Sequence, residues 1–105
     1  MMMFFEANVE SARLAYQGAW QAYHKALLNA GVLVTGHALK PASSARTVWR
    51  ENGVRQVQDG PFADTREQLG GYIIVDVPTH HEALDWAARC PAASYGTVEI
   101  RPVME

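Results

Sequence analysis

The sequence predicts an α+β fold in which a β-α-β unit, a β-hairpin and a second β-α-β unit follow one another. Two segments carry apolar residues at the three- and four-residue spacing of an amphipathic helix. Short β-branched and apolar segments lie before and after each helical segment and read as strands. An Asn-Gly dipeptide separates two alternating segments in the middle of the chain, which is a strong hairpin signal. The length of 105 residues fits a single domain over residues 1–105.

The first part of the chain predicts a strand, a helix and a second strand. Met1 to Glu6 is short and apolar, and Asn8 is placed to cap a helix from Val9 to Ala30. Five residues of that helix fall on one stripe that we expect in the core: Tyr16, Trp20, Tyr23, Leu27 and Ala30. Gly31 ends the helix because glycine accepts a left-handed backbone. Val32 to Leu39 follows as the second strand.

The middle of the chain predicts a loop and a hairpin. Lys40 to Ala45 is a loop by composition. The strands Arg46–Arg50 and Val54–Gln58 flank Glu51-Asn52-Gly53, in which Asn52 and Gly53 tolerate positive φ. The hairpin is polar over much of its surface, so we expect it at an edge of the sheet.

The second β-α-β unit begins with the most apolar strand of the chain. Gly71 to Val77 is nearly continuous in apolar residues, which suggests burial on both faces. Thr79 and Glu82 match a capping box at the start of a helix that runs to about Arg89. We expect the helix to bury four residues, with Trp86 toward one edge: Ala83, Leu84, Ala87 and Ala88.

The end of the chain predicts a loop and a last strand. Pro91 stops the helix, and Ala92 to Tyr95 reads as a loop. Thr97 to Arg101 alternates as a final strand, and Pro102 marks its end. Cys90 precedes the proline and is expected to be buried and inert.

This order of elements is the ferredoxin-like βαββαβ pattern with an inserted β-hairpin. Two helices cover one face of such an antiparallel sheet. The other face would expose apolar side chains of strands such as Tyr72 to Val77, which is unusual without a partner. We therefore predict a homodimer through the uncovered sheet face, with a pocket for a small-molecule ligand between the two sheets.

Composition and charge exclude several classes of protein. The net charge of −2 argues against direct nucleic-acid binding, which usually needs a basic stripe. No apolar run reaches the length of about 18 residues that spans a membrane. The apolar start has no basic region and is too short for a signal peptide, and the single cysteine allows no internal disulfide. We expect a cytoplasmic protein.

The segment from Asp59 to Gly71 is the strongest candidate for a functional site, since it combines turn residues with many polar groups. Asp59 has two interpretations. It closes a turn by accepting backbone N–H bonds, or it is a pocket carboxylate that acts as a general base after burial raises its pKa. Gly70 and Gly71 lack the helix and lysine of a phosphate loop, and they predict a bulge or a close backbone contact instead.

Other polar residues have both a functional and a structural interpretation. His37 ends the second strand as a proton donor or acceptor near pH 7, or as a packing residue. Arg66 binds a carboxylate substrate through its planar fork, or it forms a surface ion pair with Glu67. The run His80-His81-Glu82 is weak as a metal site because adjacent helical residues point in different directions. We expect no metal and no cofactor.

Three segments resemble the YCII-related family in its DGPF-domain branch. They are DGPFADTREQLGGYIIVDV, EALDWAARCP and YGTVEIRPV, in the family's order, with a looser match over AGVLVTGHALKP. The resemblance covers most of the chain from Gly31 to Val103 and implies a dimeric α/β barrel. It implies no settled activity; some members are linked by gene neighbourhood to sigma factors.

A His–Asp pair has been proposed as the active site of another branch of that family. The resemblance places the aspartate at Asp59 and offers His24 as the helical histidine, with His37 as the alternative proton partner. Substrate-binding residues would be Arg66, Glu67, Phe62 and Tyr95.

The predicted function is binding of a small, anionic metabolite, with or without acid–base catalysis of a lyase, isomerase or hydrolase type. The alternative is a non-catalytic regulatory or interaction module linked to sigma-factor-dependent transcription. The residues leave open whether the protein is an enzyme.

Overall fold

The computed structural model describes residues 2–6, 14–63 and 68–104. Its main sheet contains four strands in the order β2-β5-β1-β6, and all neighbouring strands are antiparallel. The strands are β1 (Met2–Glu6), β2 (Leu33–Ala38), β5 (Gln68–Val75) and β6 (Thr97–Ile100). With the hairpin left aside, the third strand lies between the first two, as in a ferredoxin-like sheet. The α+β class and its antiparallel sheet are therefore confirmed.

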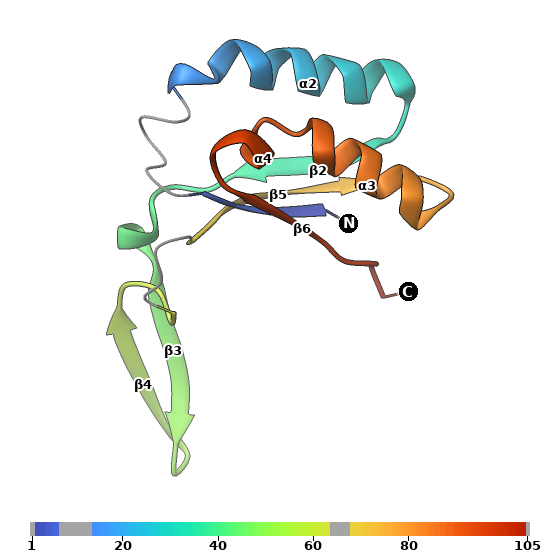
Figure 1. Cartoon of the computed structure of the whole chain (residues 1–105). Helices are drawn as coiled ribbons and strands as arrows, with labels where there is room; N and C mark the ends of the chain where they lie inside the picture. Colours follow the sequence, from blue (N-terminus) through green and yellow to red (C-terminus); the bar gives the residue numbers. More distant parts are fainter. Residues whose placement is uncertain (1, 7–13, 64–67, 105) are drawn as a thin grey trace.

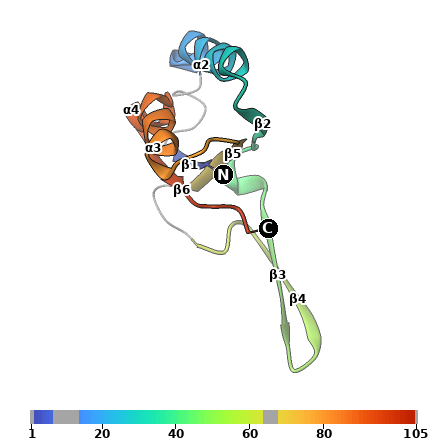
Figure 2. The same ribbon diagram turned by 90° about the vertical axis from the view of Figure 1, so that its right-hand side faces the viewer.

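Helices cover one face of this sheet (Figures 1 and 2). They are α2 (Gln17–Ala30), α3 (His80–Arg89) and α4 (Ala92–Tyr95). The last of these corrects the sequence-based prediction of a loop. Pro91 ends α3, but its own φ of −54° and ψ of −32° are helical, so the chain makes one more short helix after it.

The helix α2 follows the predicted pattern over most of its length. Gly31 ends it with a φ of 71°, and the Gly31 N–H donates to the carbonyl oxygen of Leu28 at 3.0 Å. Tyr23 and Leu27 are buried, and Tyr16 and Trp20 are half-buried. Ala30 is exposed, so its predicted place in the core is wrong; it lies in the last turn, where the chain leaves the sheet surface. The predicted cap Asn8 and the start of the predicted helix lie outside the described residues.

The helix α3 begins as predicted but faces the sheet differently. The Glu82 N–H donates to Oγ1 of Thr79 at 3.1 Å, which is the capping bond expected of Thr79. Ala87 is buried, and Trp86 packs against the core. Leu84 and Ala88 are exposed, so their predicted burial is wrong. The stripe that faces the core follows residues 83, 86, 87 and 90 at three- and four-residue spacing, with 83 and 86 half-buried, so Leu84 and Ala88 lie beside it on the outer side.

The strand β5 is one of the two central strands of the sheet, and it begins with a glycine bulge. Phe4 is opposite Gly71 while Phe5 is opposite Leu69, so Gly70 is an extra residue in β5. Gly70 and Gly71 are both buried. The predicted bulge is therefore confirmed, and the bulge lies where the polar segment after Asp59 joins the sheet.

The core lies between β5 and the helices. Ile73 and Val75 point into it from the sheet, and Leu27 and Cys90 are 1% exposed. The Tyr23 hydroxyl is buried there and donates to the carbonyl oxygen of Trp86 at 2.8 Å. Burial raises the pKa of Tyr23 well above its ordinary value, Cys90 raises it further, and Arg89 opposes the shift. The Tyr23 hydroxyl therefore stays protonated, and its hydrogen bond links α2 to α3.

The hairpin projects from the body of the protein as a separate arm (Figures 1 and 2). It consists of β3 (Arg46–Glu51) and β4 (Val54–Asp59), and it follows the one-turn 3-10 helix η1 (Ala42–Ser44). Asn52 and Gly53 have φ of 51° and 80°, which confirms the predicted tight turn. The hairpin forms a two-stranded sheet of its own, so its predicted place at an edge of the main sheet is wrong. The radius of gyration of 15.6 Å accordingly exceeds the value of about 13 Å for a compact chain of this length.

Candidate functional site

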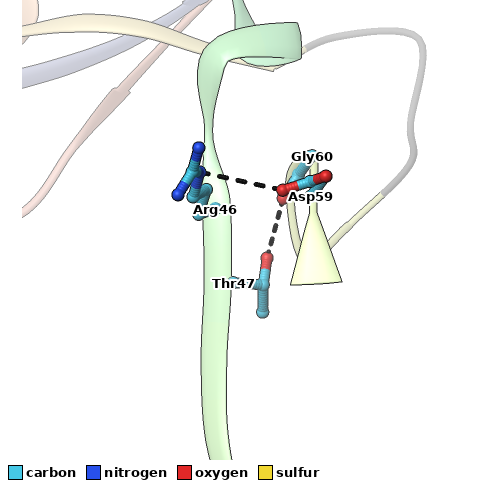
Figure 3. A network of polar contacts seen from close by, with 4 residues as sticks. All are labelled: Arg46, Thr47, Asp59 and Gly60. Atoms are coloured by element: carbon cyan, nitrogen blue, oxygen red, sulfur yellow. Dashed lines mark hydrogen bonds and ion pairs between the residues drawn. The ribbon is translucent and has the colours of Figure 1, made fainter. Parts of the chain in front are cut away.

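Asp59 lies at the base of the arm, where β4 ends (Figure 3). Two backbone-directed bonds close this base. The Thr47 hydroxyl donates to the carbonyl oxygen of Gly60 at 2.9 Å, and the Gly60 N–H donates to the carbonyl oxygen of Ala45 at 2.7 Å. Gly60 has a φ of 96°, a backbone conformation that glycine adopts without strain. The Asp-Gly-Pro turn therefore joins the arm to the loop before it.

The carboxylate of Asp59 faces solvent and an arginine. Its Oδ1 lies 3.7 Å from Nε of Arg46, the residue opposite it in the hairpin register, and the Asp59 side chain is 92% exposed. Among the described residues, this ion pair is the polar contact of the carboxylate. Among the residues that the structure describes, no backbone N–H bonds to the Asp59 carboxylate, and the side chain is open to water, whereas the two sequence-based interpretations require one or the other arrangement.

An open pocket of about 610 Å³ lies beside this base, between the loop before β3 and the loop after β4. Phe62 lines it and is 88% exposed. Most of the remaining wall is apolar or neutral. Of the described lining residues, Lys40 and Arg46 carry charge, and both are cations. The described lining therefore offers two cationic side chains, of which Arg46 is paired with Asp59, beside an apolar surface.

His37 lies elsewhere, on the sheet face that the helices leave uncovered. It is directly opposite Tyr72 in the β2–β5 register, with 5.6 Å between the ring centroids. The Thr35 hydroxyl lies 3.5 Å from Nε2 of His37. Ile73 and Val75 point into the core, so the alternation of the strand places Tyr72 and Ile74 on the uncovered face with His37. The uncovered face therefore brings together the imidazole of His37, the phenol of Tyr72 and the apolar side chain of Ile74.

His24 and Tyr95 belong to the helical layer. His24 is exposed on α2. The Tyr95 hydroxyl accepts a hydrogen bond from Nε1 of Trp20 at 3.0 Å, and its ring lies 4.9 Å from the ring of Tyr16. Tyr95 thus holds α4 against α2. Arg66 and Glu67 lie outside the described residues.

The predicted site residues that the structure describes therefore occupy three different places: the arm base, the uncovered sheet face and the helical layer. No hydrogen bond, ion pair or ring contact joins Asp59 to His37 or to His24 among the described residues. Sequence reasoning missed Lys40 and Tyr72. Lys40 and Arg46 flank the five-residue segment 41–45, and two cations at the ends of one short loop were a signal that the sequence contained, whereas the contact of Tyr72 with His37 needed the strand register.

A second open pocket, of about 400 Å³, lies at the far end of β5. Ile74, Ile100 and Arg101 line it, together with His80 at the start of α3. Arg101 is engaged by Glu99, with 3.1 Å between Nη2 and Oε2. Asp76 also lines this pocket, whereas the pocket at the arm base has Lys40 beside its paired Arg46, so the described lining here offers less free positive charge.

Within residues 2–6, 14–63 and 68–104, no three His, Cys, Asp or Glu side chains lie close enough together to hold a metal ion. Among the helices in this described part of the chain, none is long and apolar enough to cross a bilayer.

The fold and the site define a small α+β protein with a ferredoxin-like sheet and a projecting hairpin. A family model of the YCII-related domain matches residues 1–105, and the chain belongs to the YCII-related family. The chain is also similar to an uncharacterised protein of Rhizobium meliloti (strain 1021). The two are 38% identical over 84 residues, which cover 78% of this chain and 68% of that protein.

Proposed function

We propose that this YCII-related protein binds a small, anionic metabolite in the pocket at the base of the arm. The observation that carries the proposal is the charge of the pocket wall, where Lys40 and Arg46 are the charged residues among those described. Arg46 presents a planar fork that suits a carboxylate or phosphate. The apolar remainder of the wall favours a ligand with a hydrocarbon part. Phe62, at the exposed rim, supplies a surface on which such a part packs.

The proposal includes a homodimer through the uncovered sheet face. Tyr72 and Ile74 on that face are half-buried within one chain, and a second sheet against them would remove them from water. The space between two such sheets would contain His37 from each subunit. It would be a second concave region for a ligand, as the sequence-based prediction of an inter-sheet pocket requires.

We favour binding without catalysis over acid–base chemistry. A general base needs a raised pKa, which burial supplies, and the Asp59 side chain is 92% exposed. Asp59 and His37 also make separate contacts, with Arg46 and Tyr72 respectively. A catalytic role for Asp59, with His37 or His24 as proton partner and Arg66 as anion clamp, would need a partner that covers the arm base. A regulatory role beside a sigma factor stays a prediction from the family resemblance.

Titration with inorganic phosphate and with succinate tests the binding proposal. We expect both anions to bind, and Lys40→Ala to weaken binding at least about tenfold, because a charge-assisted hydrogen bond contributes roughly 1.5–3 kcal/mol. Lys25→Ala is the matched control, since Lys25 is exposed on α2, outside the pocket lining. Calorimetry or ligand-observed NMR gives the dissociation constants. Equal affinities of the Lys40→Ala variant and the unsubstituted protein would refute this site.

Asp59→Asn separates binding from catalysis. If Asp59 only balances the charge of Arg46, its neutralisation frees the guanidinium, and the affinity for phosphate should rise by up to about fivefold, the scale of a surface ion pair. The melting temperature should change little. Loss of binding would contradict the charge-balancing role, and turnover of small carboxylic acids that is lost in Asp59→Asn would support the catalytic alternative.

A further inference from the structure

The arm formed by β3 and β4 exposes apolar side chains that its own chain leaves uncovered. Val48 and Val57 are directly opposite each other and are 60% and 50% exposed. Trp49 and Val54 lie on the other face and are 42% and 59% exposed. An isolated two-stranded hairpin is only marginally stable in water. The arm also points away from the body (Figures 1 and 2), so the body of its own chain does not cover it.

The Val48–Val57 face also carries an unbalanced pair of charges. Arg50 is directly opposite Arg55, and this pair is the next one on the same face toward the tip of the hairpin. Like charges directly opposite each other destabilise a hairpin. Neither arginine has an ion pair or hydrogen bond among the described residues, whereas Arg46 at the base of the same face has Asp59. The face therefore combines an apolar centre with two cations that carboxylates from another molecule would stabilise.

The arm has a positive net charge and the rest of the chain has a negative one, so a second copy of the chain would supply such carboxylates. The chain has nine basic and eleven acidic residues, and the arm from Arg46 to Asp59 holds three arginines and two acidic residues, a net charge of +1. The remaining residues hold six basic and nine acidic residues, a net charge of −3. On the body, Asp76 and Glu82 are exposed and have no ion pair among the described residues. A basic arm and an acidic body are complementary between copies.

We propose that the arm of one copy lies on the acidic body of a second copy. The Val48–Val57 face packs against that body, and Arg50 and Arg55 face its carboxylates, with Asp76 and Glu82 as the described acceptors. The contact relieves the repulsion between the two arginines and removes the two valines from water. It goes beyond the proposed ligand site, and it does not depend on contact between the sheet faces.

Cross-linking between isotope-labelled copies tests the contact directly. Arg50→Lys keeps the charge and provides an amine that a carbodiimide couples to a touching carboxylate. In a mixture of ¹⁴N and ¹⁵N protein, we expect mixed-isotope cross-links from position 50 to body residues, with Asp76 and Glu82 among them. The unsubstituted protein is the control, since it has no amine at position 50. Cross-links confined to one chain, or none from position 50, would overturn the proposal.

A matched pair of charge reversals provides the second measurement. Arg55→Glu should weaken self-association at least about tenfold at low salt, and the loss should shrink at high salt. Lys25→Glu makes the same change of charge on the exposed side of α2 and should change the dissociation constant by less than about twofold. Equal effects of the two substitutions would overturn the proposal. Self-association that survives a disrupted sheet face but weakens in Arg55→Glu would uphold the arm contact and refute the sheet-face dimer.

Discussion

At the scale of single residues, exposure decides what each polar side chain can do. Asp59 and Tyr23 are opposite cases. Asp59 is almost fully exposed beside a guanidinium, and its carboxylate is suited to balancing charge. Tyr23 is buried with its hydroxyl on the carbonyl oxygen of Trp86, so its proton is retained and its bond joins two helices. The same reasoning favours Lys40 and Arg46, on an open pocket, as ligand contacts.

The buried hydroxyl of Tyr23 predicts a measurable loss of stability in Tyr23→Phe. The substitution leaves the carbonyl oxygen of Trp86 without this donor and should lower the free energy of unfolding by about 1–2 kcal/mol. Urea denaturation at neutral pH measures it. Tyr16→Phe is the control, because Tyr16 is only half-buried. Equal losses in both variants would contradict a specific role for the Tyr23 hydrogen bond.

The raised pKa of Tyr23 predicts a dependence of stability on alkaline pH. Its folded-state pKa is above the ordinary value of 10.0, so the stabilisation is fully present below pH 10.0 and is lost as the pH rises toward the folded-state pKa. The unfolded chain loses the phenol proton first, which favours unfolding. Denaturation curves above pH 10.0 should therefore show a shallower decline in Tyr23→Phe than in the unsubstituted protein. Identical slopes would show that other groups cause the decline.

At the scale of elements, the arm and the body differ in what holds them together. The body has helices packed on a four-stranded sheet, and its core includes Leu27, Ile73 and Val75. The arm has a tight turn, one ladder of backbone bonds and the bonds at its base to Gly60. Since the arm buries little apolar surface within one chain, it should open locally without unfolding of the body.

Gly53→Ala tests this difference. Gly53 has a φ of 80°, which costs an alanine roughly 1–2 kcal/mol. Amide exchange should become faster throughout β3 and β4, while the melting temperature of the body stays nearly unchanged. Gly18→Ala is the control in a helix, where a Cβ meets nothing within 4 Å and should stabilise by roughly 0.5–1 kcal/mol. A large fall in the melting temperature of Gly53→Ala would show that arm and body unfold together.

At the scale of the whole molecule, two surfaces are proposed to contact a second copy. One is the uncovered sheet face with Tyr72 and Ile74, and the other is the Val48–Val57 face of the arm. They differ in chemistry, because the sheet face presents Tyr72 and Ile74, whereas the arm carries two arginines directly opposite each other. Sheet contact should therefore be nearly independent of salt, whereas arm contact should weaken with it.

Ile74→Asp tests the sheet face. A carboxylate there should convert a dimer to a monomer at micromolar concentration, because an unpaired charge would be buried between two sheets. Light scattering measures the mass. Leu84→Asp is the matched control, since Leu84 is 48% exposed on α3, on the helical side of the molecule. A monomer in the unsubstituted protein would contradict the sheet-face dimer, and dimers in both variants would place any dimer contact elsewhere.

Local patterns in the sequence determined most of the elements of this protein. The Asn52-Gly53 turn, the Gly31 cap, the Thr79 cap and the bulge at Gly70 each follow from the conformational preference of one or two residues, and the structure agrees with them. The YCII-related family was likewise recognisable from the order of three short segments, which the family model confirms.

Only the tertiary structure decided which residues meet. The predicted site combined Asp59 with His37 or His24 through a family resemblance, yet His37 contacts Tyr72 through a strand register that no local pattern encodes. The buried side of α3 depended on how the helix packs on the sheet, which leaves Leu84 exposed and places Trp86 against the core. The separation of the arm from the main sheet depended on strand pairing over long distances in the chain. Local preferences act within a few residues, whereas packing joins residues far apart, and the site of this protein depends on packing.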